Sequence, residues 1–246
     1  MTTVVAALDR IARQTSVATP SSWITATTKD QLEIRDDFLL ETVDDIADRL
    51  DLASPIGQQT TLTGGAGTTN ADGSETFALP ADFKRTQRDE LALYDVDQDR
   101  PCIPVTNTGQ WTMLTDTGAA GAIKYYRIQG YDGNFTVDIY NAPGTGSEIK
   151  LAYISKNWMA TSGGTAGDML ANLDDVLLLP RRVVEVGTVW RFRERRGLPY
   201  EDKYAEYEAL MARYSNDSRG RRVVNFGGPD KDVRWQDLIP AFIPSS

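Results

Sequence analysis

Few residue types in this 246-residue chain are suited to catalysis, because it has no histidine and only one cysteine, Cys102. Without histidine, a Ser-His-Asp triad, a Cys-His dyad, a His-ligated metal site and a histidine pH switch are all impossible. One cysteine also excludes an intrachain disulfide and a cysteine-rich metal site, so we expect no dependence on an oxidising compartment. Enzymes that use carboxylates or lysine remain open.

Neighbouring carboxylates are the main candidates for acid–base chemistry. Asp89 precedes Glu90, and Asp174 precedes Asp175. A glycosidase needs two such groups facing each other across a cleft, which spacing along the sequence does not show. Aromatic residues in the middle of the chain could stack on a sugar, although core packing and subunit contacts use the same residue types. These aromatic residues are Trp111, Tyr125, Tyr126, Tyr131, Phe135 and Tyr140.

Two further motifs favour structural roles. The glycine-rich residues 64–67 look like a phosphate loop, but the Lys-Ser/Thr pair and the strand-to-helix context are missing, so we expect a mobile hairpin tip. Cys102 lies in an apolar, strand-like stretch without a general base nearby in the sequence, so we expect a buried structural thiol. The sequence therefore predicts no catalytic residue, no cofactor and no metal ion.

The charge balance argues against tight binding to nucleic acid. The chain has 26 Lys and Arg residues against 35 Asp and Glu residues, a net charge of −9. Neutralising phosphates supplies most of the affinity for nucleic acid, whereas an acidic protein repels a polyanion that must slide past it. No apolar run approaches the roughly 20 residues of a membrane span. The N-terminus lacks the basic start of a signal peptide, so we expect cytoplasmic synthesis.

Helical periodicity predicts two helices near the N-terminus. The first covers residues 3–14, and the second begins at a capping-box pattern in residues 28–31 and ends near Asp51. Apolar residues of the long helix form one stripe, and the opposite face is acidic. Such a face could supply metal ligands or catalytic acids, but it is most simply solvated, and it could also contact another subunit. Its candidate residues are Asp36, Asp37, Glu41, Asp44, Asp45 and Asp48.

The middle of the chain has the pattern of a β-domain. Short β-rich runs alternate with turn sequences, and Phe135 to Tyr140 alternates with the period of two expected of a half-buried strand. This pattern indicates an antiparallel sandwich or barrel of roughly 100 residues. The predicted strands are residues 59–63, 75–79, 91–96, 102–106, 123–128, 135–140 and 149–154.

Helical patterns return after residues 160–167, whose composition is that of a flexible linker. Pro180 begins a helix that ends at Gly197, and Pro199 begins another, so we expect an antiparallel helical hairpin. One face of the second helix has a heptad-like stripe of four tyrosines and one methionine. It consists of Tyr200, Tyr204, Tyr207, Met211 and Tyr214.

The predicted fold class is α+β, a helical bundle with an inserted antiparallel β-sandwich or barrel and an extended C-terminal arm. We expect the N-terminal helices of the bundle in residues 1–57 and the β-domain in residues 58–159. Residues 160–217 would complete the bundle, and residues 218–246 would form the arm.

The C-terminal hairpin is basic where the long N-terminal helix is acidic. Residues 181–222 contain eleven Lys and Arg against seven Asp and Glu, so 11 − 7 = +4. The arginines could bind DNA, or they could meet the acidic helix of the next subunit in a head-to-tail contact that closes into a ring. The net charge of the chain favours the ring. The basic face that we assign to this contact is Arg182, Arg191, Arg193, Arg195 and Arg196.

Residues 218–246, the last part of the chain, combine helix-breaking residues with spaced apolar residues. A disordered tail is usually poor in such residues, whereas an extended arm uses them to dock on a partner. The alternative is an arm that folds back on its own domain. The predicted anchors are Phe226, Trp235, Leu238, Ile239, Phe242 and Ile243.

Three sets of motifs give the chain a resemblance to a known family. Residues 77–83 read FALPADF and precede Arg85 and Arg88, while YNAP at 140–143 leads into IKLAY at 149–153. The third set is LPRR at 179–182, WRF at 190–192 and GLPY at 197–200. With the order of helices and strands, these segments resemble the head-to-tail adaptor (connector) proteins of tailed bacteriophages, in particular those described as tail tubular protein A-like.

The resemblance implies a structural virion protein and not an enzyme. Twelve copies would form a ring in the neck, between the capsid portal and the tail or nozzle proteins, and genomic DNA would pass through without specific binding. The helices would dock to the portal, and the C-terminal arm would extend along it. The alternative function is a β-sandwich carbohydrate-binding module or a carboxylate-based glycan hydrolase, and a third hypothesis is a DNA-binding hairpin.

Overall fold

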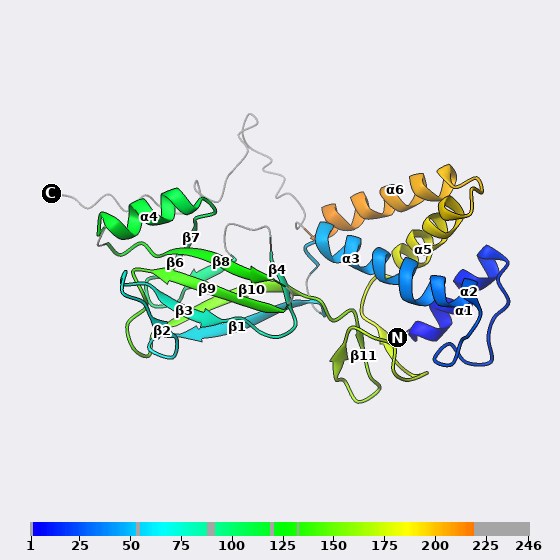
Figure 1. The fold of residues 1–246 in the computed structure, drawn as a ribbon, viewed down its shortest axis with the longest axis horizontal. Helices are drawn as coiled ribbons and strands as arrows, with labels where there is room; N and C mark the ends of the chain where they lie inside the picture. The colour runs from blue at the N-terminus through cyan, green and yellow to red at the C-terminus, as the bar shows by residue number, and fades with distance from the viewer. Residues whose placement is uncertain (1, 53–54, 88–91, 119–120, 132, 219–246) are drawn as a thin grey trace, which may run out of the picture.

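The computed structural model describes residues 2–52, 55–87, 92–118, 121–131 and 133–218. The fold is mixed α+β, with two lobes side by side along the longest axis (Figure 1). We call the part formed by α1 to α3, α5, α6 and a small sheet the helical lobe. The β lobe contains strands β1 to β10 and helix α4.

The helical lobe joins helices from both ends of the described chain. Helix α1 (Val4–Thr15) packs on α5 (Arg181–Arg195), which also contacts α3 (Leu39–Arg49) and α6 (Glu201–Ser218). One apolar cluster connects them, because Leu8 of α1, Ile46, Val186 of α5 and Tyr207 are all fully buried.

The long N-terminal helix is present but changes its winding. It starts as α2 (Lys29–Leu32), continues as the π-helix η1 (Glu33–Phe38) and then becomes α3. Thr28 occupies the N-cap position without a side-chain hydrogen bond, so the predicted capping box is wrong. Gln31 is buried instead and donates its Nε2 hydrogen bond to the carbonyl of Ala18 at 2.7 Å.

One sheet of the β lobe is built around its longest strand. Strand β10 (Glu148–Ser155) pairs along seven residues with β1 (Gly57–Thr63). On its other side it pairs with β4 (Phe83–Thr86) and β5 (Leu93–Asp95), and β5 pairs with β6 (Arg100–Pro101). All pairings in this sheet are antiparallel.

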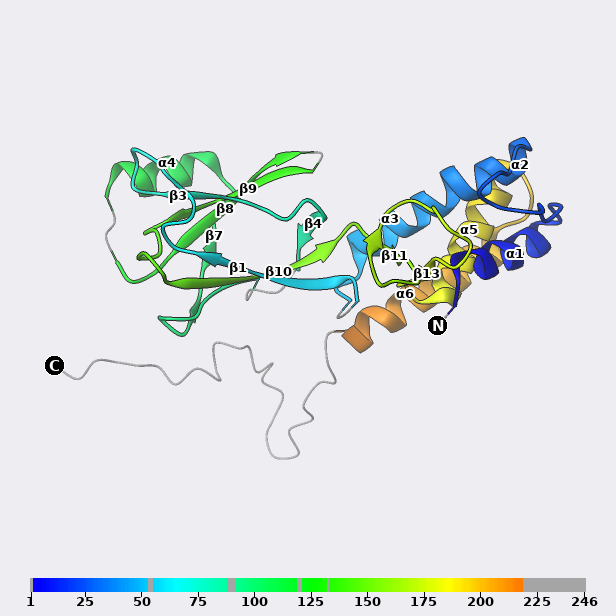
Figure 2. The same ribbon diagram turned by 90° about the horizontal axis from the view of Figure 1, so that it is seen from below.

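The second sheet has the order β2-β3-β9-β8-β7. It consists of β2 (Thr68–Thr69), β3 (Glu75–Ala78), β9 (Asn134–Tyr140), β8 (Tyr125–Tyr131) and β7 (Ile103–Pro104). Only the short β7–β8 pairing is parallel. The two sheets lie in separate layers (Figure 2).

One apolar cluster contains residues of both sheets. Leu93 and Ile149 come from the first sheet, and Val137 and Ile139 come from the second; each is fully buried. Cys102 belongs to the same cluster and is 1% exposed. The expectation of a buried thiol is therefore confirmed.

Two local predictions are wrong. Residues 160–167 are not a linker: β11 (Met159–Ala160) pairs with β12 (Ala166–Gly167), and β11 also pairs with β13 (Val176–Leu177). Residues 64–67 do not close a hairpin, because β1 and β2 belong to different sheets.

Helix α4 (Thr108–Asp116) was not expected from the sequence. The side chain of Asn107 caps it by accepting hydrogen bonds from the amides of Gly109 and Gln110. Trp111 is its one fully buried residue in the described structure, and its ring contacts Tyr140 edge-to-face. The helix therefore covers part of the β lobe through a single aromatic anchor.

Candidate functional site

The acidic and basic helices meet inside one protomer. Arg191 of α5 places Nη2 3.1 Å from Oδ2 of Asp45 on α3, and its Nη1 donates to Thr42 Oγ1 at 3.2 Å. Tyr207 of α6 donates its hydroxyl hydrogen to the same Asp45 oxygen at 2.6 Å. Burial, and then the hydrogen bond to Asp45, raises the pKa of Tyr207. Asp45 and Arg191 therefore connect three helices of the same chain.

A second connection joins α3 to α6. Arg49 donates two hydrogen bonds to the carboxylate of Glu208, at 2.7 and 2.6 Å. The hydrogen bonds from Arg49 are the main reason that the pKa of Glu208 is lowered from its usual value. Such a bidentate pair has a better-defined geometry than a single ionic contact.

Most of the predicted basic face is also paired within the chain. Arg182 contacts Glu206, Arg193 lies 3.5 Å from Asp202, and Arg196 contacts Glu33 at 2.8 Å.

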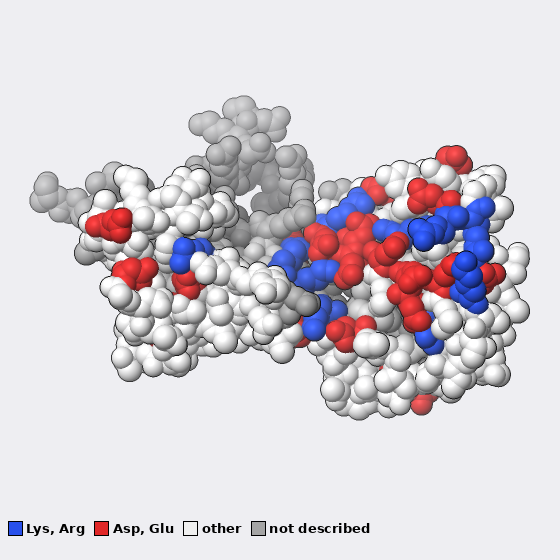
Figure 3. Space-filling view, in the orientation of Figure 1, with Lys and Arg blue, Asp and Glu red and all other residues white. Residues whose placement is uncertain are grey.

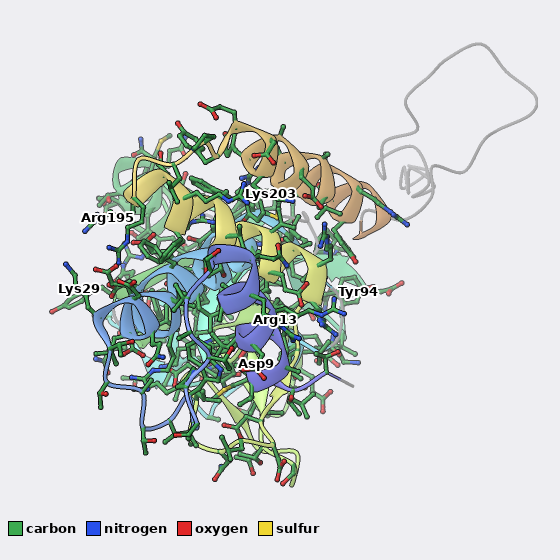
Figure 4. All side chains as sticks on the ribbon, turned by 90° about the vertical axis from the view of Figure 1, so that its right-hand side faces the viewer. Asp9, Arg13, Lys29, Tyr94, Arg195 and Lys203 are labelled. Carbon is green, nitrogen blue, oxygen red and sulfur yellow. The ribbon has the colours of Figure 1, made fainter. Side chains whose placement is uncertain are left out.

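Arg195 differs from these arginines. It is exposed and makes no ion pair with any residue of the described structure. In the end-on view of the helical lobe it lies at the periphery (Figure 4). Arg195 is therefore available to an external partner.

Asp and Glu side chains form a band across the helical lobe, bordered by Lys and Arg side chains (Figure 3). Asp36 pairs with Arg35 at 2.5 Å, whereas Glu41 is 63% exposed and reaches Arg191 only at 3.9 Å. Asp37 is exposed and makes no ion pair within the described ranges. The outer part of this face therefore keeps its negative charge on the surface.

Lysine and arginine residues of β4 bind the C-terminal end of α3. Lys84 contacts Asp44 at 2.6 Å and Asp48 at 3.3 Å. Arg85 donates to the carbonyls of Ala47 and Leu50, at 2.9 Å each. These contacts connect the β lobe directly to the acidic helix.

The Arg85 contact was not predicted from the sequence. Arg85 also donates to Asp51 Oδ1 at 2.6 Å, so its guanidinium supplies donors to the carbonyls that the end of a helix leaves without partners. The motif that contains Arg85 gave no indication of this role, because its partners are 34 to 38 residues away in the sequence.

Of the features considered for chemistry, the glycine-rich loop and Asp175 have partners within the chain. Glu75, which is 2% exposed, accepts hydrogen bonds from the amides of Gly65 at 2.9 Å and Gly67 at 2.8 Å, so a carboxylate of the same chain uses the amides of the glycine-rich loop. Asp175 is fully buried and accepts from the amides of Ala171 and Asn172.

The environment of the thiol does not favour reactivity. Burial raises the pKa of Cys102 to about 12, so little thiolate exists near neutral pH. In the described residues, no group of three or more Asp, Glu or Cys side chains could hold a metal ion. None of the described helices is both long enough and apolar enough to cross a membrane. The pair of Asp89 and Glu90 lies outside the described residues.

Comparison with known protein families identifies the chain. The model of the SU10 adaptor protein family matches residues 2–230, which is nearly the whole sequence. The chain belongs to the SU10 adaptor protein family. No curated protein matches it. The resemblance to phage head-to-tail adaptors is thereby confirmed, and in this SU10 adaptor family member the conspicuous charges connect helices and lobes. The predicted anchors from Phe226 to Ile243 lie outside the described residues.

Proposed function

We propose that this chain is a structural head-to-tail adaptor of a tailed bacteriophage and has no enzymatic activity or cofactor. Twelve copies form a ring in the virion neck, between the portal and the tail or nozzle proteins, after synthesis in the host cytoplasm. The family match over residues 2–230 is the observation that carries this proposal. Genomic DNA passes through the ring without specific binding.

The two-lobe arrangement supports a connecting role. We propose that residues 1–57 and 160–217 form one helical bundle that docks to the portal. The inserted β-sandwich, residues 58–159, faces the tail. Lys84 and Arg85 hold the two lobes together, so force applied to one end is passed to the other.

The charges suggest how neighbouring subunits meet. Arg195 on α5 and Asp37 on η1 are exposed and make no ion pair within the described residues. We assign Arg195 of one copy to the acidic face of the next, which is the head-to-tail contact that a ring requires. An exposed ion pair contributes only about 0–1 kcal/mol, so the contact depends on repetition around the ring. The remaining exposed carboxylates suit a DNA passage, because like charges repel.

The C-terminal arm is the proposed attachment to the portal. Its six apolar anchors, from Phe226 to Ile243, would bind the portal surface as an extended segment. The test is co-sedimentation of portal rings with the full chain and with a chain that ends at Arg222. We expect the shortened chain to keep its circular dichroism spectrum and to lose portal binding.

The control is a full-length Lys231→Ala variant, which keeps every apolar anchor and should bind portal as the parent chain does. Retained binding by the shortened chain would reject the arm assignment, whereas absence of binding by the parent chain would reject the adaptor function.

A further inference from the structure

Strand β1 has one edge, along its whole length, that no described strand pairs with. Among the described strands it pairs only with β10. The bonds from Ser155 N to Ile56 O and from Gly64 N to Ser147 O show that even-numbered residues of this segment face β10. Odd-numbered residues such as Gln59 and Thr61 therefore direct their N–H and C=O groups outward. The strand contains neither charge nor proline, the features that usually protect an edge from pairing.

Beyond Tyr126, the side of strand β8 away from β9 has no partner among the described strands. Strand β7 pairs with Tyr125 and Tyr126 only, and no other described strand pairs with β8 on the side away from β9. The bond from Leu79 N to Phe135 O directs odd-numbered residues of β9 towards β3, so even-numbered β9 residues face β8. The register then leaves the backbone of Ile128 facing outward.

A hollow of about 340 Å³ follows this edge. Residues 126–129 of β8 form one side, and residues 104–108 with Thr86 form the other. Arg127 is its one charged lining residue, and it already pairs with Asp138 at 2.9 Å. The groove therefore contains an unpaired strand edge surrounded by polar side chains with little net charge. An uncharged strand could bind there.

The two free edges lie on opposite sides of the β lobe. Strand β1 is at one end of its sheet, and it leads directly into β2 at the end of the other sheet. Strands β6 and β7 end the opposite sides of the two sheets, with β8 next to β7. Figure 1 shows β1 and β2 at the lower side and β7 with α4 at the upper side. Two different surfaces on opposite sides of one molecule are what a head-to-tail contact needs.

We propose that the β1 edge of one copy adds as a strand to the β8 edge of the next copy, in the groove lined by residues 104–108. This inference rests on the proposed function, because a head-to-tail contact of this kind closes only in a ring. Main-chain hydrogen bonds supply the affinity, and the Thr and Gln side chains of β1 occupy the polar groove. A single added strand buries little surface, so this contact between two copies is weak by itself. It becomes stable because every copy in a closed ring makes the same contact.

The first test uses Thr61, which has an exposed side chain and an outward-facing N–H. Thr61→Pro removes that donor without removing a hydrogen bond to β10, and proline is tolerated at such edge positions. Thr61→Ala is the matched control, because it keeps the donor. With portal rings present, we expect ring assembly of Thr61→Pro, measured by negative-stain electron microscopy, to fall at least tenfold. Thr61→Ala should assemble as the parent chain does.

The second test uses the groove. Thr106→Trp places an indole in the groove at an exposed position, with Thr106→Ser as its control. Thr106→Trp alone should form no rings. A mixture of Thr61→Pro and Thr106→Trp has one intact groove and one intact edge per pair of copies, so no ring can close and the mixture should form no rings on the portal either. Unchanged thermal unfolding midpoints show that both variants are folded.

The outcomes separate this inference from the proposed function. If the parent chain forms rings and Thr61→Pro forms them equally well, the strand contact is wrong and the adaptor function stands. If Thr61→Pro forms rings that no longer bind a tail protein, the edge serves that protein and the inference is overturned. If the parent chain forms no rings on portal, the proposed function fails and the inference fails with it.

Discussion

Arg85 supplies hydrogen-bond donors at the end of a helix that belongs to the other lobe. The last carbonyls of α3 have no donors within their own helix, and Arg85 reaches those of Ala47 and Leu50 together with the Asp51 carboxylate. A positive charge is also favourable at a helix C-terminus. Together with Lys84, this side chain of β4 connects the β lobe to the acidic helix.

This role predicts the effect of removing the guanidinium. Arg85→Ala should lower the free energy of unfolding in urea by about 2 kcal/mol, because several charge-assisted hydrogen bonds are lost and the carbonyls keep no partner. Arg100→Ala is the control, since Arg100 is exposed and should change stability by no more than about 0.5 kcal/mol. Equal effects of the two substitutions would show that Arg85 does not hold the lobes together.

At the scale of the elements, Gly187 allows α5 to approach its two neighbours closely. A methyl group at position 187 would lie 2.4 Å from Thr42 Cγ2 on α3 and 2.8 Å from Tyr207 Cε2 on α6. Gly187→Ala should therefore destabilise the protein by about 1–3 kcal/mol in urea unfolding, although alanine is the better helix former. The double variant with Thr42→Ser removes the nearest methyl group and should recover part of the loss. No recovery would mean that Thr42 does not limit the approach.

The pairing of α3 and α6 makes a prediction about pH. Arg49 lowers the pKa of Glu208 from its usual 4.5, so the pair stabilises the fold fully above about pH 5. That contribution is lost as the pH falls below 4.5 through the lower folded-state pKa. A double-mutant cycle with Arg49→Gln and Glu208→Gln should give a coupling energy of about 0.2–1 kcal/mol at pH 7. The coupling should be smaller at pH 4, and a coupling that is constant or larger there would contradict the assignment.

Local patterns predicted the long elements well. The stripe that includes Leu39, Val43 and Ile46 indicated the helix of which α3 is a part, and the strands β9 and β10 follow from their apolar alternation. The π-helix could not be predicted from the sequence. At its end the adjacent residues Phe38 and Leu39 are both buried, which depends on how the helix packs in the folded protein. Helix α4 has only Trp111 fully buried, so its apolar period is weak.

The partners of the charged residues in the candidate site could not be predicted from local sequence patterns either. The opposite charges of the two helices are visible in the sequence, but their partners are decided by tertiary structure. Arg191 reaches Asp45 across 146 residues of sequence, so an arginine that we assigned to a subunit contact connects helices of one chain. The hairpin of residues 160–167 was missed for a related reason. Its composition is that of a linker, while its partners Val176 and Leu177 lie further along the chain.

At the scale of the whole molecule, two lobes with different surfaces are joined by charged contacts. The helical lobe exposes an acidic band, and the β lobe exposes two strand edges that carry almost no charge. Such a subunit can meet its neighbours through different parts of its surface at once. We therefore propose that this subunit assembles into a ring between the portal and the tail proteins.

Negative-stain electron microscopy of the purified chain mixed with portal rings tests this claim most directly. We expect a second ring stacked on one end of the portal, with twelve copies counted in class averages and an open central channel. Portal rings that remain bare at saturating concentrations of the chain, or copies that bind singly without closing a ring, would contradict it.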